Sequence, residues 1–144
     1  MAAKKVRLRI VTPKEIKFNE DVDMIIMRCT TGDMGILPGH EPRSAVLNYG
    51  VLRILNDGNE HRVAVFGGLA EMQNNVLTIL TNGAEWPRDI DRASAMFDRE
   101  HAERRLQERI DDIEIQDDLV LLRRALVRIE VSAEPLVNAP DREG

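Results

Sequence analysis

The stretch YGVLRILNDGNEHRVAVFGG, from Tyr49 to Gly68, contains two runs rich in Val, Leu and Ile on either side of Asn56 to Asn59. Aliphatic and β-branched residues of this kind pack well on the pleated surface of a sheet. Asparagine, aspartate and glycine tolerate the positive φ angles that a tight hairpin turn requires. The stretch therefore predicts two antiparallel strands that are joined by a short turn.

Similar short runs and turns extend on both sides of this hairpin. Toward the N-terminus, Val6, Leu8 and Ile10 alternate with arginines, which predicts a strand with one face on a core. Toward the C-terminus, Asn74 and Asn75 mark another hairpin turn. Many short strands separated by turns are typical of a β-sandwich or barrel. We expect an antiparallel β-sandwich in residues 1–86.

The composition changes after Pro87 to Ala, Glu, Arg and Leu, with no glycine until the last residue, which favours helices. The second helical segment has an apolar stripe with spacings of three and four residues, formed by Leu119, Leu122, Leu126, Ile129 and Ala133. Asp117 or Asp118 is placed to cap its start. We expect an antiparallel two-helix hairpin in residues 87–133 and a flexible tail in 134–144.

The charge and composition exclude several classes of protein. A net charge of −5, from 25 acidic and 20 basic side chains, is not that of a nucleic-acid-binding protein. The single cysteine, Cys29, cannot form an internal disulfide, and we expect it to be buried on a strand. No signal peptide is recognisable, which predicts a cytosolic chain. No apolar run is long enough for a membrane span, so we expect membrane contact only through another protein.

Motifs for catalysis and metal binding are absent from the sequence. The segment GDMGILPG lacks the GK[ST] ending of a Walker A loop. The three histidines have no partners at metal-ligand spacing. A general-base role for His40 would need a serine or cysteine nucleophile that the sequence does not place near it. We therefore predict no catalytic residue, no metal site and no tightly bound cofactor.

The stretch TTGDMGILPGHEP, from Thr30 to Pro42, is predicted to be a loop because it contains three glycines and two prolines. Two interpretations of this loop are open: it only allows tight turns, or it forms a rigid surface for a partner. The side chains suited to docking are three apolar groups, one acid and one histidine: Met34, Ile36, Leu37, Asp33 and His40.

The run GDMGILPGHEP, followed by YGVLRI and VAVFGGLAEMQNNVLTILTNGAE, resembles the epsilon subunit family of F-type ATP synthases. The hallmark of that family is a G-x-x-G-I-x-P-G-H-x-P loop in a β-sandwich that precedes a helical hairpin. The resemblance covers Val6 to Val131. It implies a non-catalytic rotor subunit of the central stalk, which couples proton translocation to ATP synthesis. The Thr30 to Pro42 loop would then meet the gamma subunit and the ring of c subunits.

The resemblance also implies a regulatory role for the hairpin. In bacterial members the hairpin either folds onto the sandwich or extends along gamma, where it slows ATP hydrolysis. In the extended form, Arg123, Arg124 and Arg128 would meet acidic surfaces of the alpha and beta subunits in the catalytic head. The alternative is that these arginines form only a solvated helix face.

Some members of that family bind ATP through an I-D-x-x-R-A motif at the start of the first helix. This chain reads IDRASA, in which Ile90, Asp91 and Ala95 match and Ser94 replaces the arginine. Serine cannot supply the planar, multidentate donor of a guanidinium. We therefore predict weak ATP binding or none.

Two functions of other classes are also open from the residues alone: a stand-alone β-sandwich module that binds a ligand or protein, and a small enzyme. An aromatic content of 3% is low for the stacking surfaces of sugar or single-strand binders. By the resemblance, the chain would lie at the cytoplasmic face of a bacterial plasma membrane as a peripheral part of the synthase. An organelle-encoded chain would equally lack a transit peptide.

Overall fold

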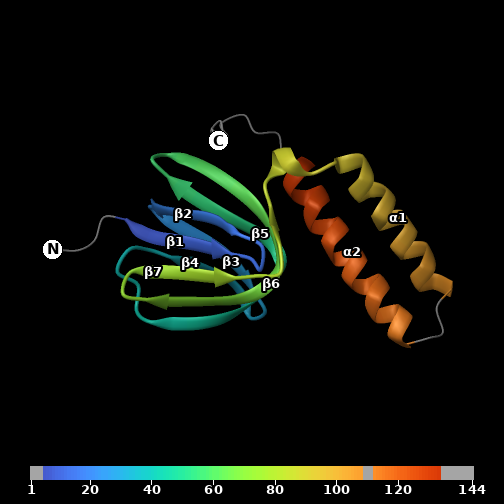
Figure 1. Cartoon of the computed structure of the whole chain (residues 1–144), viewed down its shortest axis with the longest axis horizontal. Coiled ribbons are helices and arrows are strands. Elements are labelled where there is room, and N and C mark those ends of the chain that lie inside the picture. Colours follow the sequence, from blue (N-terminus) through green and yellow to red (C-terminus); the bar gives the residue numbers. More distant parts are fainter. Residues whose placement is uncertain (1–4, 109–111, 134–144) are drawn as a thin grey trace.

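The computed structural model describes residues 5–108 and 112–133, in which a strand-rich region is followed by two helices (Figure 1). The strands are β1 (Val6–Val11), β2 (Ile16–Val22), β3 (Met24–Cys29), β4 (Gly32–Ile36), β5 (Arg43–Asn56), β6 (Asn59–Gln73), β7 (Val76–Leu80) and β8 (Ala84–Glu85). The helical elements are η1 (Pro87–Asp89), α1 (Arg92–Glu108) and α2 (Asp112–Ala133).

The strands follow the spatial order β2-β1-β7-β6-β5-β3-β4, with β8 paired to β6. Every pairing is antiparallel except that of β1 with β7, which is parallel. The sheet is therefore mostly antiparallel, as expected, with one parallel exception.

The two turns expected from asparagine and glycine are confirmed. Asp57 and Gly58 connect β5 to β6 with φ angles of 52° and 81°, and Asn74 and Asn75 connect β6 to β7 with 53° and 61°. Two successive residues with positive φ form the turn whose twist matches the flanking strands.

The larger of two apolar clusters among the described residues lies inside the strand region. Val6, Leu8 and Ile10 of β1 are fully buried, as their alternation with arginine predicts. Phe18 of β2 and Ile36 of β4 belong to the same core cluster, although these strands lie at opposite ends of the strand order. The sheet therefore folds back on itself around its apolar face.

The prediction that Thr30 to Pro42 is entirely loop is wrong for its first part. Residues Gly32–Ile36 form β4, which pairs along its whole length with β3. The backbone of this edge strand gains ladder hydrogen bonds whatever its side chains are, so glycine content alone did not exclude a strand. The turn that follows begins at Leu37.

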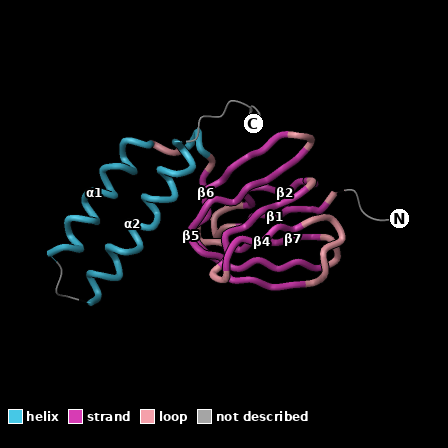
Figure 2. The backbone as a smooth tube through the Cα atoms, turned by 180° about the vertical axis from the view of Figure 1, so that it is seen from behind, coloured by secondary structure: helices cyan, strands magenta, loops and turns pink. Residues whose placement is uncertain are grey.

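The two helices run antiparallel beside the strand region, with α2 between α1 and strands β5 and β6 (Figures 1 and 2). The expected apolar stripe of α2 is wrong at Leu126, which is 45% exposed, whereas Ala125, Val127 and Val131 are buried. A single apolar stripe is expected when a helix packs against one partner. Because α2 contacts both α1 and the sheet, the buried positions of α2 spread around the helix.

The expected helix cap at Asp117 or Asp118 is also wrong, because α2 begins at Asp112. Asp118 lies inside the helix and is 5% exposed, and its Oδ1 lies 3.1 Å from Nε of Arg105 on α1. This ion pair stabilises the contact between the helices. The predicted flexible tail, 134–144, lies outside the described residues.

Candidate functional site

The turn after β4 presents one apolar side chain to solvent. Leu37 is 53% exposed, and the amide of His40 donates a hydrogen bond to the carbonyl oxygen of Leu37 at 3.1 Å. Asp33 is exposed on β4 and lies 4.0 Å from Nε of Arg28. Met34 packs partly against the core. Of the residues expected to contact a partner, Ile36 alone is buried in the core, so its side chain supports the turn from within.

A second surface was not recognised from the sequence. Val46 of β5, Leu69 of β6 and Leu80 of β7 are 52%, 54% and 52% exposed. They are direct partners across the sheet, Val46 with Leu69 and Leu69 with Leu80. They thus form one row across three adjacent strands, which we call the apolar row. In the sequence, the apolar residues at these three positions were the signal that could have indicated this surface. The strand register that aligns them, however, is not local in sequence.

Side chains of the apolar row line two grooves. One has a volume of about 290 Å³ and is lined by both apolar and polar side chains, including Ala45, Leu69 and Glu71. The other, of about 440 Å³, runs along Leu69 and Leu80 to Val11 and Asn82. Exposed apolar side chains that line such grooves form a surface that a protein partner can cover.

The helices meet the strand region through a small apolar contact. Val127 and Val131 of α2 pack on Val51, Ala64 and Phe66 of the sheet, and Tyr49 and Ile90 lie at its border. Each buried side chain of this kind contributes about 1.5–3 kcal/mol. The contact is therefore limited: among the described residues, the helical members of this cluster are Val127 and Val131, both on α2.

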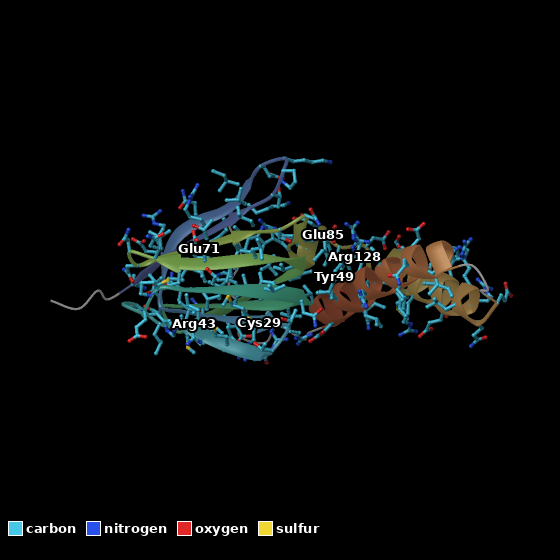
Figure 3. All side chains as sticks on the ribbon, turned by 90° about the horizontal axis from the view of Figure 1, so that it is seen from below. Cys29, Arg43, Tyr49, Glu71, Glu85 and Arg128 are labelled. Atoms are coloured by element: carbon cyan, nitrogen blue, oxygen red, sulfur yellow. The ribbon has the colours of Figure 1, made fainter. Side chains whose placement is uncertain are left out.

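Two bidentate ion pairs border this contact. Nε and Nη2 of Arg128 donate to Glu85 of β8 at 2.7 and 2.9 Å, and these two residues lie together at the junction of helix and sheet in Figure 3. Nη1 and Nη2 of Arg28 on β3 donate to Glu130 at 3.3 and 3.2 Å. These hydrogen bonds are the main cause of the raised pKa of each arginine.

The arginines expected to act on a catalytic head occupy three different environments. Arg123 is exposed, as a residue free to meet another protein would be. Arg124 and Arg128 each place the guanidinium carbon 5.2 Å from the centre of the Phe66 ring. Nε of Arg124 is buried without a hydrogen-bond partner among the described residues. In this conformation, Arg128 and Arg124 hold α2 to the sheet, which neither interpretation from the sequence foresaw.

The segment that matches the ATP motif has structural roles of its own. Oδ1 of Asp91 accepts a hydrogen bond from the amide of Ser94 at 3.1 Å and so satisfies a donor in the first turn of α1. Ala95 is buried, and Ile90 packs at the border of the helix contact. A groove of about 460 Å³ has Lys14, Lys17, Arg124 and Arg128 on its walls together with Glu15 and Glu85, but none of the residues that match the ATP motif lines it.

Groups that could bind a metal do not gather in the described part of the chain. Within residues 5–108 and 112–133, no three His, Cys, Asp or Glu side chains could share a metal ion. Cys29 is buried as expected, and this burial, with a smaller effect of Asp33, raises the pKa of its thiol. None of the described helices has the length and apolar content needed to cross a membrane.

The fold and sequence were compared with those of known proteins. The family model described as ATP synthase, Delta/Epsilon chain, beta-sandwich domain matches residues 5–87. The ATP synthase epsilon chain of Caldicellulosiruptor bescii is 37% identical over 127 residues, which are 88% of this chain and 93% of that one. The epsilon chain of Bacillus subtilis is 39% identical over 131 residues, 91% and 99% of the two chains.

A solved chain from the Euglena gracilis mitochondrial ATP synthase, in a structure of OSCP, F1 and c-ring, has the same fold. Its TM-score is 0.81 at 24% identity, with 93% of this chain and 84% of that chain covered. Taken with the sequence matches, these findings show that the chain belongs to the ATP synthase epsilon chain family.

As an epsilon subunit, the chain is a non-catalytic component of the central stalk of F-type ATP synthase. The family assignment replaces the two other classes considered from the sequence, the stand-alone binding module and the small enzyme.

Proposed function

We propose that residues 1–86 form the rotor part of this subunit, which binds the gamma subunit and the c ring and transmits rotation driven by proton translocation. The observation that carries this proposal is the apolar row of Val46, Leu69 and Leu80, which lies uncovered across three strands. Exposed apolar side chains in direct register provide a continuous surface for a lasting contact. A gamma subunit is the occupant that the family assignment supports.

The turn after β4 is assigned to the c ring. Leu37 and His40 lie at this turn, and Asp33 lies exposed on the strand before it. An apolar group with a neighbouring acid and imidazole suits a mixed polar and apolar loop on a partner. The similar Euglena gracilis chain belongs to a structure of OSCP, F1 and c-ring, which supports this assignment.

We further propose that residues 87–133 are a regulatory hairpin that leaves the sheet and extends into the alpha and beta head, where it slows ATP hydrolysis. The small apolar contact of Val127 and Val131 supports this role, because a limited contact can be exchanged for another one of similar size. Release would expose Arg124 and Arg128 together with Arg123. All three would then face acidic groups of the head.

The location we propose is the cytoplasmic face of a bacterial plasma membrane, as a peripheral part of the synthase. The relatives from Caldicellulosiruptor bescii and Bacillus subtilis are bacterial chains, which supports this location. We propose no tightly bound cofactor.

A direct test compares ATP hydrolysis by synthase complexes assembled with the full chain and with a version that ends at Arg88. Faster hydrolysis with the truncated chain would support the regulatory hairpin. Equal rates with normal assembly would overturn that role and leave the rotor role standing. If the full chain does not assemble with gamma and the c ring, the rotor role itself is overturned.

A further inference from the structure

Asn75, in the turn between β6 and β7, connects three segments that are distant in sequence. Its Oδ1 accepts a hydrogen bond from the amide of Gly39 at 2.9 Å. Its Nδ2 donates to the carbonyl oxygen of Lys5 at 2.8 Å. Its own carbonyl oxygen accepts from the amide of Arg7 at 3.1 Å. One residue thereby joins the turn after β4 to the β6–β7 turn and to the start of β1.

The backbone conformation of Asn75 makes these contacts possible. Its φ is 61°, in the left-handed region that asparagine enters more readily than most residues. Asparagine also carries both an acceptor and a donor at the end of a short side chain. The acceptor binds the amide of Gly39 and the donor binds the carbonyl oxygen of Lys5. Neither Asp, which lacks the donor, nor Gly, which lacks both groups, could make the two hydrogen bonds.

The turn held by Asn75 would otherwise have few constraints. It lies after the end of β4 at Ile36 and before the start of β5 at Arg43, outside the ladder of the sheet. Gly39 has a φ of 76°, and glycine itself adds conformational freedom. The hydrogen bond to Asn75 ties the middle of the turn to the body of the sheet.

We infer that Asn75 is a positioning residue for docking to the c ring, because it holds the turn that presents Leu37 and His40 in one conformation before the partner arrives. This inference rests on the proposed role of that turn in the rotor. Ordering a mobile turn on binding costs conformational entropy, and a turn that is already ordered avoids this cost. Loss of the Asn75 side chain should therefore weaken docking without removing any atom that touches the partner.

The test compares three variants of the full chain. Asn75→Gly removes both side-chain hydrogen bonds while it permits the same φ and keeps the carbonyl that accepts from Arg7. Asn75→Asp keeps an acceptor for Gly39 but loses the donor to Lys5. Asn74→Gly changes the neighbouring turn residue, which has a φ of 53° and is exposed, and serves as the matched control.

Two quantities are measured: hydrogen exchange of the Gly39 amide in the free chain by NMR, and affinity for synthase depleted of its epsilon subunit. In Asn75→Gly we expect exchange at Gly39 to accelerate by roughly fivefold to tenfold and affinity to fall by a similar factor, as for one lost hydrogen bond. Asn75→Asp should stay close to the parent chain in both, and Asn74→Gly should match it.

Unchanged Gly39 exchange in Asn75→Gly would overturn the inference, because the turn would then not depend on the side chain. Faster exchange with unchanged affinity would overturn it as well, provided that Leu37→Glu weakens docking. If Leu37→Glu also leaves the affinity unchanged, the turn is not a docking surface, and it is the proposed function that fails at this point.

Discussion

Arg128 on α2 and Glu85 on β8 form a bidentate ion pair, with donor–acceptor distances of 2.7 and 2.9 Å, at the junction of the helices and the sheet. Both side chains are partly buried, and the guanidinium also lies over the ring of Phe66. The pair therefore links the two halves of the described chain at the place where they would separate if the hairpin were released.

We predict that Arg128→Ala increases opening of the hairpin in the free chain. The amides in the last two turns of α2 should exchange faster with solvent, because the ion pair and the contact with Phe66 are lost together. A double-mutant cycle with Glu85→Ala should give a coupling of about 1 kcal/mol, the upper range for partly exposed pairs. Arg123→Ala, on the exposed side of the same helix, is the control and should change little. Exchange that is equal in all variants would show that the pair does not hold the hairpin.

The apolar row gives a prediction about assembly. Leu69→Glu places a charge in the middle of the row, and we expect the affinity for epsilon-depleted synthase to fall at least about tenfold. The free energy of unfolding of the free chain should change by less than about 1 kcal/mol, since the Leu69 side chain is half exposed.

Ile16→Glu is the matched control for Leu69→Glu. Ile16 is an apolar residue on β2 that is 53% exposed, but it is not part of the apolar row. It should therefore assemble normally. Equal assembly of Leu69→Glu and the parent chain would show that gamma does not cover the row.

Glu60 gives a prediction about pH. It accepts hydrogen bonds from Arg53 at 2.8 and 3.1 Å and from Arg62 at 2.7 Å, and these arginines are direct partners across β5 and β6. The hydrogen bond with Arg53, aided by Arg62 and opposed by burial, lowers the pKa of Glu60 from 4.5 to about 2. The ionised carboxylate of Glu60 thus offsets the repulsion between the guanidinium groups of Arg53 and Arg62.

Because the folded-state pKa lies below the unfolded value, this carboxylate stabilises the fold fully above about pH 4.5, and the contribution is lost as the pH falls toward 2. We expect Glu60→Gln to lower the free energy of unfolding at pH 7 by about 1–2 kcal/mol, after allowance for solvent screening. Its stability should then fall less steeply below pH 4.5 than that of the parent chain. Thermal unfolding at pH 7 and pH 3 measures both effects, with Glu71→Gln, on the exposed part of β6, as the control.

The replacement of the motif arginine by Ser94 predicts that ATP does not bind the free chain with a Kd below about 1 mM. The carboxylate of Asp91 already accepts a hydrogen bond from the amide of Ser94, which an ATP ligand at this motif would have to replace. Calorimetric titration of the full chain with ATP and Mg²⁺ measures this. Ser94→Arg restores the residue of the family motif and is the matched variant. Micromolar binding by the parent chain would contradict the prediction.

Local patterns predicted the elements that depend on local energetics. The turns at Asp57 and at Asn74 followed from residues that tolerate positive φ, and the burial of Val6, Leu8 and Ile10 followed from alternation along one strand. These features depend on the backbone preferences of a few neighbouring residues. The change of composition at Pro87 likewise predicted the start of the helical region.

The wrong predictions arose where pairing or packing between two elements decided the outcome. Residues Gly32–Ile36 became a strand because β3 offered a partner edge. Leu126 became exposed, and Val127 and Val131 were buried, because α2 packs on the sheet as well as on α1. Asp118 does not cap the helix as expected but forms an ion pair with Arg105 on the other helix. In each case the partner belongs to a different strand or helix from the position concerned.

The sequence by itself determined the family, because the residues that match it can be read directly from the chain. It also determined the strand-then-helix order, the hairpin turns and the turn that contains Leu37 and His40. These local features depend on residues that are close along the chain. Only the tertiary structure decided which surfaces are available. Strand register aligned Val46, Leu69 and Leu80, and folding placed Arg128 on Glu85 and Asn75 on Gly39. The physical reason is that register and docking are set by the summed burial and hydrogen bonding of the whole chain, which no single segment encodes.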